Sequence, residues 1–488
     1  MAEETIGVVA PRFTAGRPWL PGRGGRSSEG GWVMSGKRVT NASGSSNALR
    51  GDVLRALGVL KMATADQIQR LSSPHLTYRH TAKKTPAQRK EARTASHRAA
   101  ANDLRRHGLS VNGGRTRAGE EVRLLTTAGL AAAAVELGRA PEEMGGLPKG
   151  AGRTGAAHAM TVNETVLALI HPQPDLSLIE GEPDEVLAAA RTAAEAPSGI
   201  GTIASYATEV ALPVSGTWKS PGFGSARADA VVTAPEHGMP LLFIEADNCH
   251  EDTVTIAAKF DRYARFYLRT AKDTVGGARL WSTRWNYDAD PDRDPLPPIL
   301  LVFNEIGARS ARTQIRNVAA LTRHHWEGQP DSEGAFHSYR GKIPIVATRL
   351  DLLREHGPHG SVFWRFGRKH REDLWSAVGN PREDATLRQR AQAHRQRQAQ
   401  EKRQQAREAA QREAQRPSCT RCGQKLTDDR WHMTETFPEP DHNWRPGVCA
   451  SCEADVLHQE KEQERAEAEE KQRQEAEANR PRGLFRRR

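Results

Sequence analysis

The chain of 488 residues has no long apolar run and no apolar leader. Its longest hydrophobic stretches are too short to cross a bilayer as a helix. The N-terminal residues are rich in Gly, Arg and Ser and lack the apolar segment of a secretory signal. These absences exclude the membrane-spanning and secreted classes and predict a cytoplasmic protein.

Cysteine is also scarce, with five residues in all, too few for a disulfide scaffold. Four of them form two CxxC pairs, and in a cytoplasmic chain this spacing indicates metal binding. Two such pairs can close a tetrahedral site with no open position, which is typical of structural zinc. The expected ligands are Cys419, Cys422, Cys449 and Cys452, in a zinc ribbon over 417–456. The alternative is a pair of redox dithiols, although no thioredoxin-like βαβ pattern surrounds them.

The chain has fewer acidic than basic residues, with 60 Asp and Glu against 71 Lys and Arg, which gives a net charge of +11 and a pI near 9.6. This excess favours an anionic partner, with double-stranded DNA first. The same excess is also found on the ordinary solvated surface of an Arg-rich chain, so charge alone does not identify the partner and the motifs are needed. Residues 1–46 contain few apolar residues and are expected to be a disordered basic arm.

The region 47–138 shows the segment order of a winged helix-turn-helix domain. Thr64 and Gln67 form a capping box that opens a short second helix. The polar stretch 75–91 contains Pro86 and is expected to be a loop. The predicted elements are helices over 49–60, 64–73, 94–107 and 127–137 and a hairpin over 110–125 that turns at Asn112-Gly113.

Two groups of DNA contacts are expected from this region. Side chains at i, i+4 and i+7 on one face of the third helix are base-edge candidates: Arg98, Asn102 and Arg105. Basic side chains at the end of that helix and at the hairpin tip are expected to contact phosphate: Arg106, Arg115 and Arg117. The alternative is a helical cap whose arginines only keep it soluble.

After a linker over 139–157, helices and strands alternate, which predicts a multidomain α/β chain with a mixed sheet over 158–378. Strands are expected at 203–212, 230–232, 241–245, 299–303 and 343–347, with helices from 161 and over 255–268. Residues 379–416 are a charged linker, either a solvated helix or disordered, and 457–488 form a similar charged tail.

Three acidic residues mark the central strands. Glu245 and Asp247 are two apart on one strand and point to the same face, and a hairpin partner sets Asp229 beside them. Such crowding is stabilised by a divalent metal, a shared proton or a nearby cation, so it predicts a metal site. The alternative is a solvated edge whose acids pair with Lys259 and Arg262.

These residues also carry a resemblance to a known family. Ala228-Asp229-Ala230-Val231-Val232, Glu245-Ala246-Asp247-Asn248-Cys249-His250-Glu251, Lys259 and Tyr263 resemble the replication-relaxation family of actinobacterial plasmids and mobile elements, over roughly 47–366. The resemblance implies a winged helix joined to a core similar to PD-(D/E)XK nucleases. It also implies action on element DNA during replication or strand relaxation, with double-stranded DNA and replication or transfer proteins as partners.

Within that resemblance Asp229 is the first acid and Glu245 the second, and both are expected to hold Mg²⁺ or Mn²⁺. Glu209 or Glu164 is the candidate auxiliary carboxylate. Asp247 departs from the pattern, because such nucleases have a lysine there to stabilise developing negative charge.

Lys259 on the following helix is the candidate replacement for that lysine. Two hypotheses follow for the core: a DNA-binding platform without chemistry, or a metal-dependent endonuclease or nickase that uses Asp229, Glu245 and Lys259. Cys249 beside the acids is interpreted as a packed thiol, since no His or Asn partner with a defined role identifies it as a nucleophile.

Overall fold

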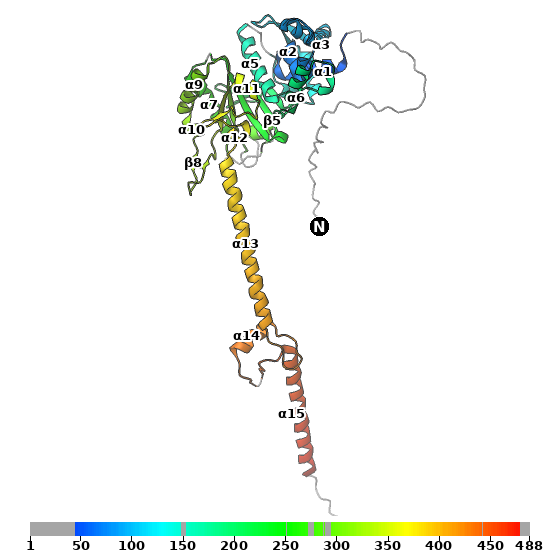
Figure 1. Ribbon diagram of the computed structural model, residues 1–488. Coiled ribbons are helices and arrows are strands. Elements are labelled where there is room, and N and C mark those ends of the chain that lie inside the picture. The colour runs from blue at the N-terminus through cyan, green and yellow to red at the C-terminus, as the bar shows by residue number, and fades with distance from the viewer. Residues whose placement is uncertain are drawn as a thin grey trace, which may run out of the picture.

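The structure is a computed structural model that describes residues 44–147, 153–249, 251–271, 278–285, 287, 294–441 and 443–478. The expected basic arm, residues 1–46, lies outside the described residues except for its last three. The end of the charged tail, 479–488, also lies outside them. The described chain has mixed α/β structure, as the sequence predicted. It combines a globular part with two long helices that lead away from it (Figure 1).

The globular part begins with an N-terminal module of helices and a small antiparallel sheet of strand order β1-β3-β2. Thr64 and Gln67 form the predicted capping box at the start of the second helix. The elements are α1 (Asn47–Leu60), β1 (Met62–Thr64), α2 (Ala65–Ser72), α3 (Pro86–Arg106), β2 (Ser110–Arg115), β3 (Glu121–Leu125) and α4 (Thr127–Leu137). The 3₁₀ turns Pro74–Tyr78 and Pro141–Met144 complete the module.

Two details of this module differ from the sequence prediction. Helix α3 begins at Pro86 and not near Thr94, because Thr85 caps it in a capping box with Gln88 and proline is well tolerated in the first helical turn. The hairpin turns over 116–120 and not at Asn112-Gly113, where strand β2 continues. The predicted loop over 75–91 is therefore wrong for its last six residues.

The larger sheet has six strands in the order β11-β10-β7-β6-β5-β4. Strands β6, β7 and β10 are parallel, whereas β4, β5 and β11 pair antiparallel with their neighbours, so the sheet is mixed as predicted. The strands are β4 (Tyr206–Leu212), β5 (Ala226–Ala234), β6 (Met239–Asp247), β7 (Ile299–Phe303), β10 (Ile345–Arg349) and β11 (Trp364–Arg365). Strands β5 and β6 extend beyond the predicted 230–232 and 241–245 because their flanking residues also pair, and β7 has its predicted bounds. Strand β4 is shorter than the predicted 203–212, since residues 203–205 form a 3₁₀ turn, and β10 is shifted by two residues from 343–347.

Helices cover both faces of this sheet. One face packs on a cluster with α5 (Arg153–Ile170), α11 (Leu350–His356) and α12 (Leu374–Val378). The other packs on α7 (Thr253–Leu268), α8 (Leu280–Trp285) and α9 (Ala308–Leu321). The remaining elements are α6 (Asp184–Glu195), α10 (Arg323–Trp326), the short pair β8 (Gln329–Pro330) and β9 (His337–Ser338), and the 3₁₀ turns Leu176–Leu178, Ile203–Ser205 and Pro235–His237. Helix α5 starts within the expected linker 139–157.

The N-terminal module and the sheet share one hydrophobic core. A single cluster of buried residues contains Val53 and Leu57 from α1, Val166 from α5 and Ile244 from β6. The predicted domains 47–138 and 158–378 therefore pack against each other through this cluster, while the face of the sheet under α7 has a second cluster of its own.

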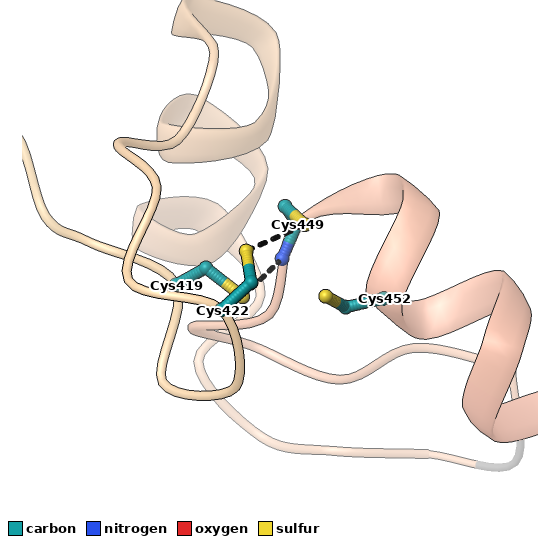
Figure 2. A group of neighbouring side chains, drawn as sticks. All are labelled: Cys419, Cys422, Cys449 and Cys452. Atoms are coloured by element: carbon teal, nitrogen blue, oxygen red, sulfur yellow. Dashed lines mark hydrogen bonds between the residues drawn. The ribbon is translucent and has the colours of Figure 1, made fainter.

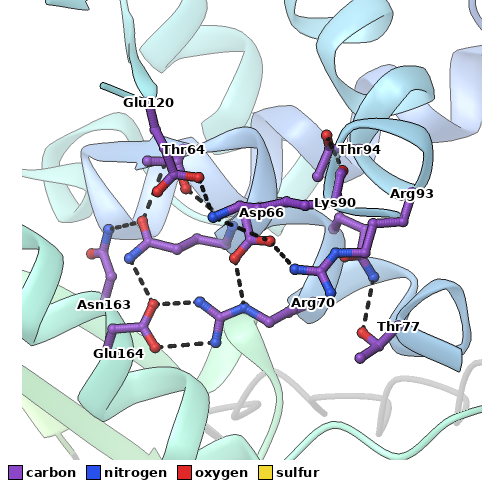
Figure 3. A network of polar contacts seen from close by, with 12 residues as sticks. Thr64, Asp66, Arg70, Thr77, Lys90, Arg93, Thr94, Glu120, Asn163 and Glu164 are labelled. Carbon is purple, nitrogen blue, oxygen red and sulfur yellow. Dashed lines mark hydrogen bonds and ion pairs between the residues drawn. The ribbon is translucent and has the colours of Figure 1, made fainter. Parts of the chain in front are cut away.

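A polar network crosses the same junction (Figure 3). Arg70 of α2 binds Glu164 of α5 through two hydrogen bonds and also donates to Asp66 at 3.0 Å. Arg354 of α11 pairs with Glu164 at 2.7 Å. Burial alone raises the pKa of Glu164, but the two arginines outweigh it and lower the value to about 2. The carboxylate is thus charged and links three helices.

Beyond the core, α13 (Pro381–Gln415) has no buried residue and leaves the globular part as a single rod (Figure 1). At about 1.5 Å per residue its 35 residues span about 52 Å. The charged linker is thus a solvated helix, one of its two predicted alternatives. A cysteine module with α14 (Asp428–Thr436) follows, and α15 (Ala450–Ala478) continues beyond it. Among the described helices, none combines the length and apolar character needed to span a membrane.

We expect Glu164→Gln to lower the free energy of unfolding of the globular part by about 2 to 3 kcal/mol at pH 7, because Arg70 and Arg354 lose the charged partner that they share. The folded-state pKa lies below the ordinary value, so this stabilisation is present above about pH 4.5 and disappears as pH falls towards 2. Denaturant unfolding from pH 7 to pH 2.5 measures it. Glu355→Gln on α11, a 70% exposed carboxylate, is the control. A constant difference at all pH values contradicts the assignment.

Candidate functional site

Strands β5 and β6 bring the two motif acids together. Ala230 pairs with Ile244 in their antiparallel register, so the next residues along the strands, Asp229 and Glu245, lie opposite each other. Both are buried, at 8% and 2% exposure. The negative charge of Asp229 contributes to the pKa shift of Glu245, which shows that the two carboxyl groups interact.

Helix α7 supplies the partners of Glu245. Tyr263 donates its hydroxyl to Oε1 at 2.5 Å, and the Lys259 ammonium donates to Oε2 at 3.2 Å. Burial and the charge of Asp229 raise the pKa of Glu245 to about 8, against the opposing effect of these two donors. Burial alone lowers the pKa of Lys259, but Glu245 and Asp229 outweigh it and raise the value, so the ammonium stays charged.

Asp247 lies on the same face as Glu245, as its spacing of two residues predicted. Both line a small cavity with Glu251 and Lys259. Burial and the charge of Glu251 raise the pKa of Asp247. Lys259 also pairs with Glu251 at 3.0 Å, so its ammonium lies between two carboxylates. The Lys259 ammonium thus reaches the acidic residues of β6 from α7.

Asp229 has partners on both oxygens. Its Oδ2 accepts a hydrogen bond from the backbone N–H of Ala246 at 2.8 Å, and its Oδ1 lies 3.0 Å from Nε2 of His158. All four carboxylate oxygens of Asp229 and Glu245 therefore contact protein donors. An Mg²⁺ ion shared by these two acids would have to displace Tyr263 or Lys259 from Glu245, because the ion needs free carboxylate oxygens.

The two candidate auxiliary carboxylates lie in different places. Glu209 of β4 falls opposite Asp229 in the β4–β5 register. Glu164 is engaged by Arg70 and Arg354 at the junction with the N-terminal module, so its carboxylate is committed there. His158 was not predicted, since it precedes the expected start of its helix. The signal that would have placed it is the register of α5, in which His158 is one turn before Val162.

Cys249 is a packed thiol, in agreement with its interpretation. Its Sγ donates to the backbone carbonyl of Asn304 at 3.0 Å. Burial and the nearby Asp247 raise its pKa to about 11, which keeps it protonated and unreactive at neutral pH.

The expected DNA contacts lie on α3 and on the β2–β3 hairpin. Arg105 and Arg106 are exposed at the end of α3, and Arg115 and Arg117 are exposed on the hairpin. Asn102 is half-buried, and its Oδ1 accepts a hydrogen bond from Arg123 of β3 at 2.8 Å.

Arg98, the first of the three base-edge candidates, also has a local partner. Its guanidinium donates to the carbonyl of Glu91 at 3.0 Å, about two helical turns earlier, and lies 3.7 Å from the carboxylate of Glu91. Arg115 and Arg106 also have local partners, the carbonyl of Gly119 and the carboxylate of Asp103.

The four CxxC cysteines converge at the far end of α13 (Figure 2). Their sulfur atoms all lie within 4.8 Å of one another, and Sγ of Cys422 is 3.7 Å from Sγ of Cys449. Tetrahedral zinc with bonds of about 2.3 Å places its sulfur ligands roughly 3.8 Å apart. Backbone N–H groups, chiefly that of Cys449, lower the pKa of Cys419 to about 6. These residues can hold a metal ion such as zinc.

The surrounding module differs from the predicted zinc ribbon. Its strand pairing among the described residues is one isolated bridge, Ser418 with Lys425, and the second cysteine pair is at the first turn of α15. Arg430 organises the loop between the pairs: it donates to the carbonyls of Val448 and Arg445 and pairs with Glu453 at 2.6 Å. Polar contacts thus take the place of a β-hairpin.

We expect Cys422→Ser to abolish binding of about one zinc ion per chain and to make residues 417–456 sensitive to protease, because this module has little apolar core of its own. The melting temperature of the globular part should not change. Metal analysis and limited proteolysis of the full-length protein measure both effects. Cys249→Ser, the matched control, should keep its zinc. Retention of zinc by Cys422→Ser contradicts the four-thiolate site.

Comparison with known proteins finds a family model that matches part of the chain. No curated protein and no solved structure matches the chain significantly. Residues 54–278 match the family model described as Replication-relaxation. This segment runs from α1 through the acid-bearing strands β5 and β6 to the end of α7, so it contains both the N-terminal module and the motif acids. Residues 54–278, a little under half of the chain, are thus similar to the replication-relaxation family, in agreement with the resemblance found in the sequence.

Proposed function

We propose that this protein binds double-stranded DNA through its N-terminal module, in the replication or strand relaxation of a plasmid or mobile element. The observation that carries the proposal is the location of the charge. Residues 47–138 contain sixteen Lys and Arg but only seven Asp and Glu, a net charge of +9, whereas the whole chain has +11. A basic surface on one module is typical of nucleic-acid binding.

The arrangement of that module supports a winged helix-turn-helix assignment. Helix α3 follows α2 after a connection over residues 73–85 that contains the 3₁₀ turn Pro74–Tyr78, and the antiparallel hairpin β2–β3 comes directly after α3. In such domains the last helix of the motif enters the major groove and the hairpin lies beside it on the backbone. Arg98 and Arg105 are then placed for base edges, and Arg106, Arg115 and Arg117 for phosphates.

Asn102 has a different role in this proposal from the one expected from sequence. Because its carbonyl oxygen accepts from Arg123, it ties α3 to the hairpin strand β3. We therefore treat Asn102 as a residue that positions the hairpin, and Arg98 and Arg105 as the contacts that read sequence.

The core is proposed to be a nuclease-like platform that holds DNA without cutting it. The supporting observation is that both carboxyl oxygens of Glu245 are held by donors of α7, Tyr263 and Lys259, and so are not free for a metal ion shared with Asp229. The cysteine module is proposed to hold structural zinc. It lies at the end of α13, far enough from the core to reach other parts of the DNA or replication proteins.

One observation favours the alternative, a metal-dependent endonuclease or nickase. Asp229 and Glu245 face each other, and the Lys259 ammonium is 3.2 Å from Glu245. A cation beside paired acids is the arrangement that such nucleases use to stabilise charge on the scissile phosphate.

We expect the double variant Arg115→Ala, Arg117→Ala to weaken binding to a mixed-sequence 25-bp duplex about tenfold or more at 0.15 M salt, and to reduce the slope of log K against log salt by about 2. Fluorescence anisotropy at several salt concentrations measures both. Arg323→Ala in the core, a 67% exposed arginine, is the matched control and should behave as wild type. Unchanged affinity in the double variant would refute hairpin binding.

We expect supercoiled plasmid to stay intact when it is incubated with the protein and Mg²⁺, although the protein binds it. Agarose gels and a filter-binding assay on the same samples separate cutting from binding. Nicked or linear product that is absent with Glu245→Gln, while this variant still binds DNA, would instead establish the endonuclease alternative. Glu236→Gln, an exposed glutamate after β5, is the control for the substitution itself.

A further inference from the structure

Three possible metal ligands meet beside the motif acids on the side away from Glu245. His158 comes from α5, Glu209 from β4 and Asp229 from β5, and their ligand atoms all lie within 4.8 Å of one another. Nε2 of His158 is 3.0 Å from Oδ1 of Asp229. These residues lie far apart in the sequence, so the fold brings them together.

The backbone at Glu209 has an unusual conformation. Its φ angle is +55°, a left-handed value that costs energy for a residue other than glycine, and it lies inside strand β4. Thr208 and Val210 on either side keep their pairing with β5. The backbone is thus locally strained at Glu209, the acidic residue that lies opposite Asp229.

The cluster is open to solvent through a groove between the N-terminal module and the core. The groove has a volume of about 1290 Å³, and His158 and Glu209 line it together with Lys61, Met62 and Arg227. Side-chain exposure is 38% for His158 and 45% for Glu209, against 11% for Asp229. An ion can therefore reach the cluster and keep water ligands.

The geometry already suits a metal ion. An octahedral site with bonds of about 2.1 Å places neighbouring ligand atoms roughly 3.0 Å apart, which is the separation of the His158 and Asp229 atoms. The bond from the Ala246 N–H to Oδ2 fixes the Asp229 carboxylate and leaves Oδ1 directed at His158. The ion takes the place of the hydrogen bond between them.

We propose that His158, Glu209 and Asp229 bind one divalent transition-metal ion, such as Mn²⁺, at the wall of this groove. One imidazole nitrogen with two carboxylate oxygens suits ions of intermediate hardness, and the open side leaves room for water. This site uses Asp229 but not Glu245, whose oxygens are held by Tyr263 and Lys259. It is therefore distinct from the paired-acid site expected from the sequence.

Arg227 is the competing partner of Glu209. The two groups are 3.4 Å apart, and both are well exposed, at 60% and 45%. Exposed ion pairs contribute little stability, so the ion can displace Arg227 from Glu209 at small cost.

The test is Mn²⁺ binding to the full-length, zinc-loaded protein without DNA, measured from the loss of the free Mn²⁺ signal in electron paramagnetic resonance. Wild type should bind one Mn²⁺ in a saturable way. Glu209→Gln and His158→Gln should each weaken this binding at least tenfold with unchanged melting temperature. Because Glu209 is exposed, Glu209→Gln decides the question if His158→Gln fails to fold.

Two controls address other sites. Asp261→Asn removes the carboxylate from a second cluster, Asp261 with His324 and His325 on the surface, and should bind Mn²⁺ as wild type does. His237→Gln changes a histidine that contacts one carboxylate and should also have no effect. The proposal fails if wild type shows no saturable binding, if Glu209→Gln binds normally, or if Asp261→Asn loses the ion. None of these outcomes bears on DNA binding, which is measured separately.

Discussion

The position of helix α5 is the constraint on which the rest of the globular structure depends. Its apolar side chains, including Val162 and Val166, belong to the core shared by the N-terminal module and the sheet. Glu164 on the same helix binds Arg70 and Arg354, and His158 near its start contacts Asp229. Removing the charge on Glu164 would leave Arg354 without this partner and Arg70 with Asp66 alone. One helix therefore fixes the N-terminal module and the motif acids relative to each other.

Charge of opposite sign is separated in this architecture. The motif acids Asp229 and Glu245 are buried in the core, where Lys259 and Tyr263 hold Glu245. The arginines of the hairpin and of the end of α3 are exposed, among them Arg105 and Arg117. If the N-terminal module binds DNA as proposed, an approaching phosphate backbone meets these exposed cations, while the buried acids lie away from the surface.

The sequence predicted those parts of the fold and of the candidate site that a local pattern decides. The capping box at Thr64 and the apolar run of β6 gave the elements, and the spacing of Glu245 and Asp247 gave their common face. Failures occurred where the deciding contact is tertiary. Pro86 lies in a polar stretch and was interpreted as part of a loop. In the structure it lies in the first turn of α3, which Thr85 caps. His158 was missed because its partner, Asp229, is 71 residues away.

In the cysteine module, too, a local pattern predicts one part of the structure and contacts between distant residues decide the rest. Helix α13 buries no residue, so the module at its end cannot draw stability from the core. Its own buried set is Cys419, Leu426 and Cys452, which is far below what an autonomous domain requires. Metal binding therefore has to supply the missing free energy, as it does in small zinc domains. The spacing of the four cysteines was sufficient to predict that they form a cluster, because each CxxC pair is local, while the helical form of the module depends on Arg430 and its backbone acceptors.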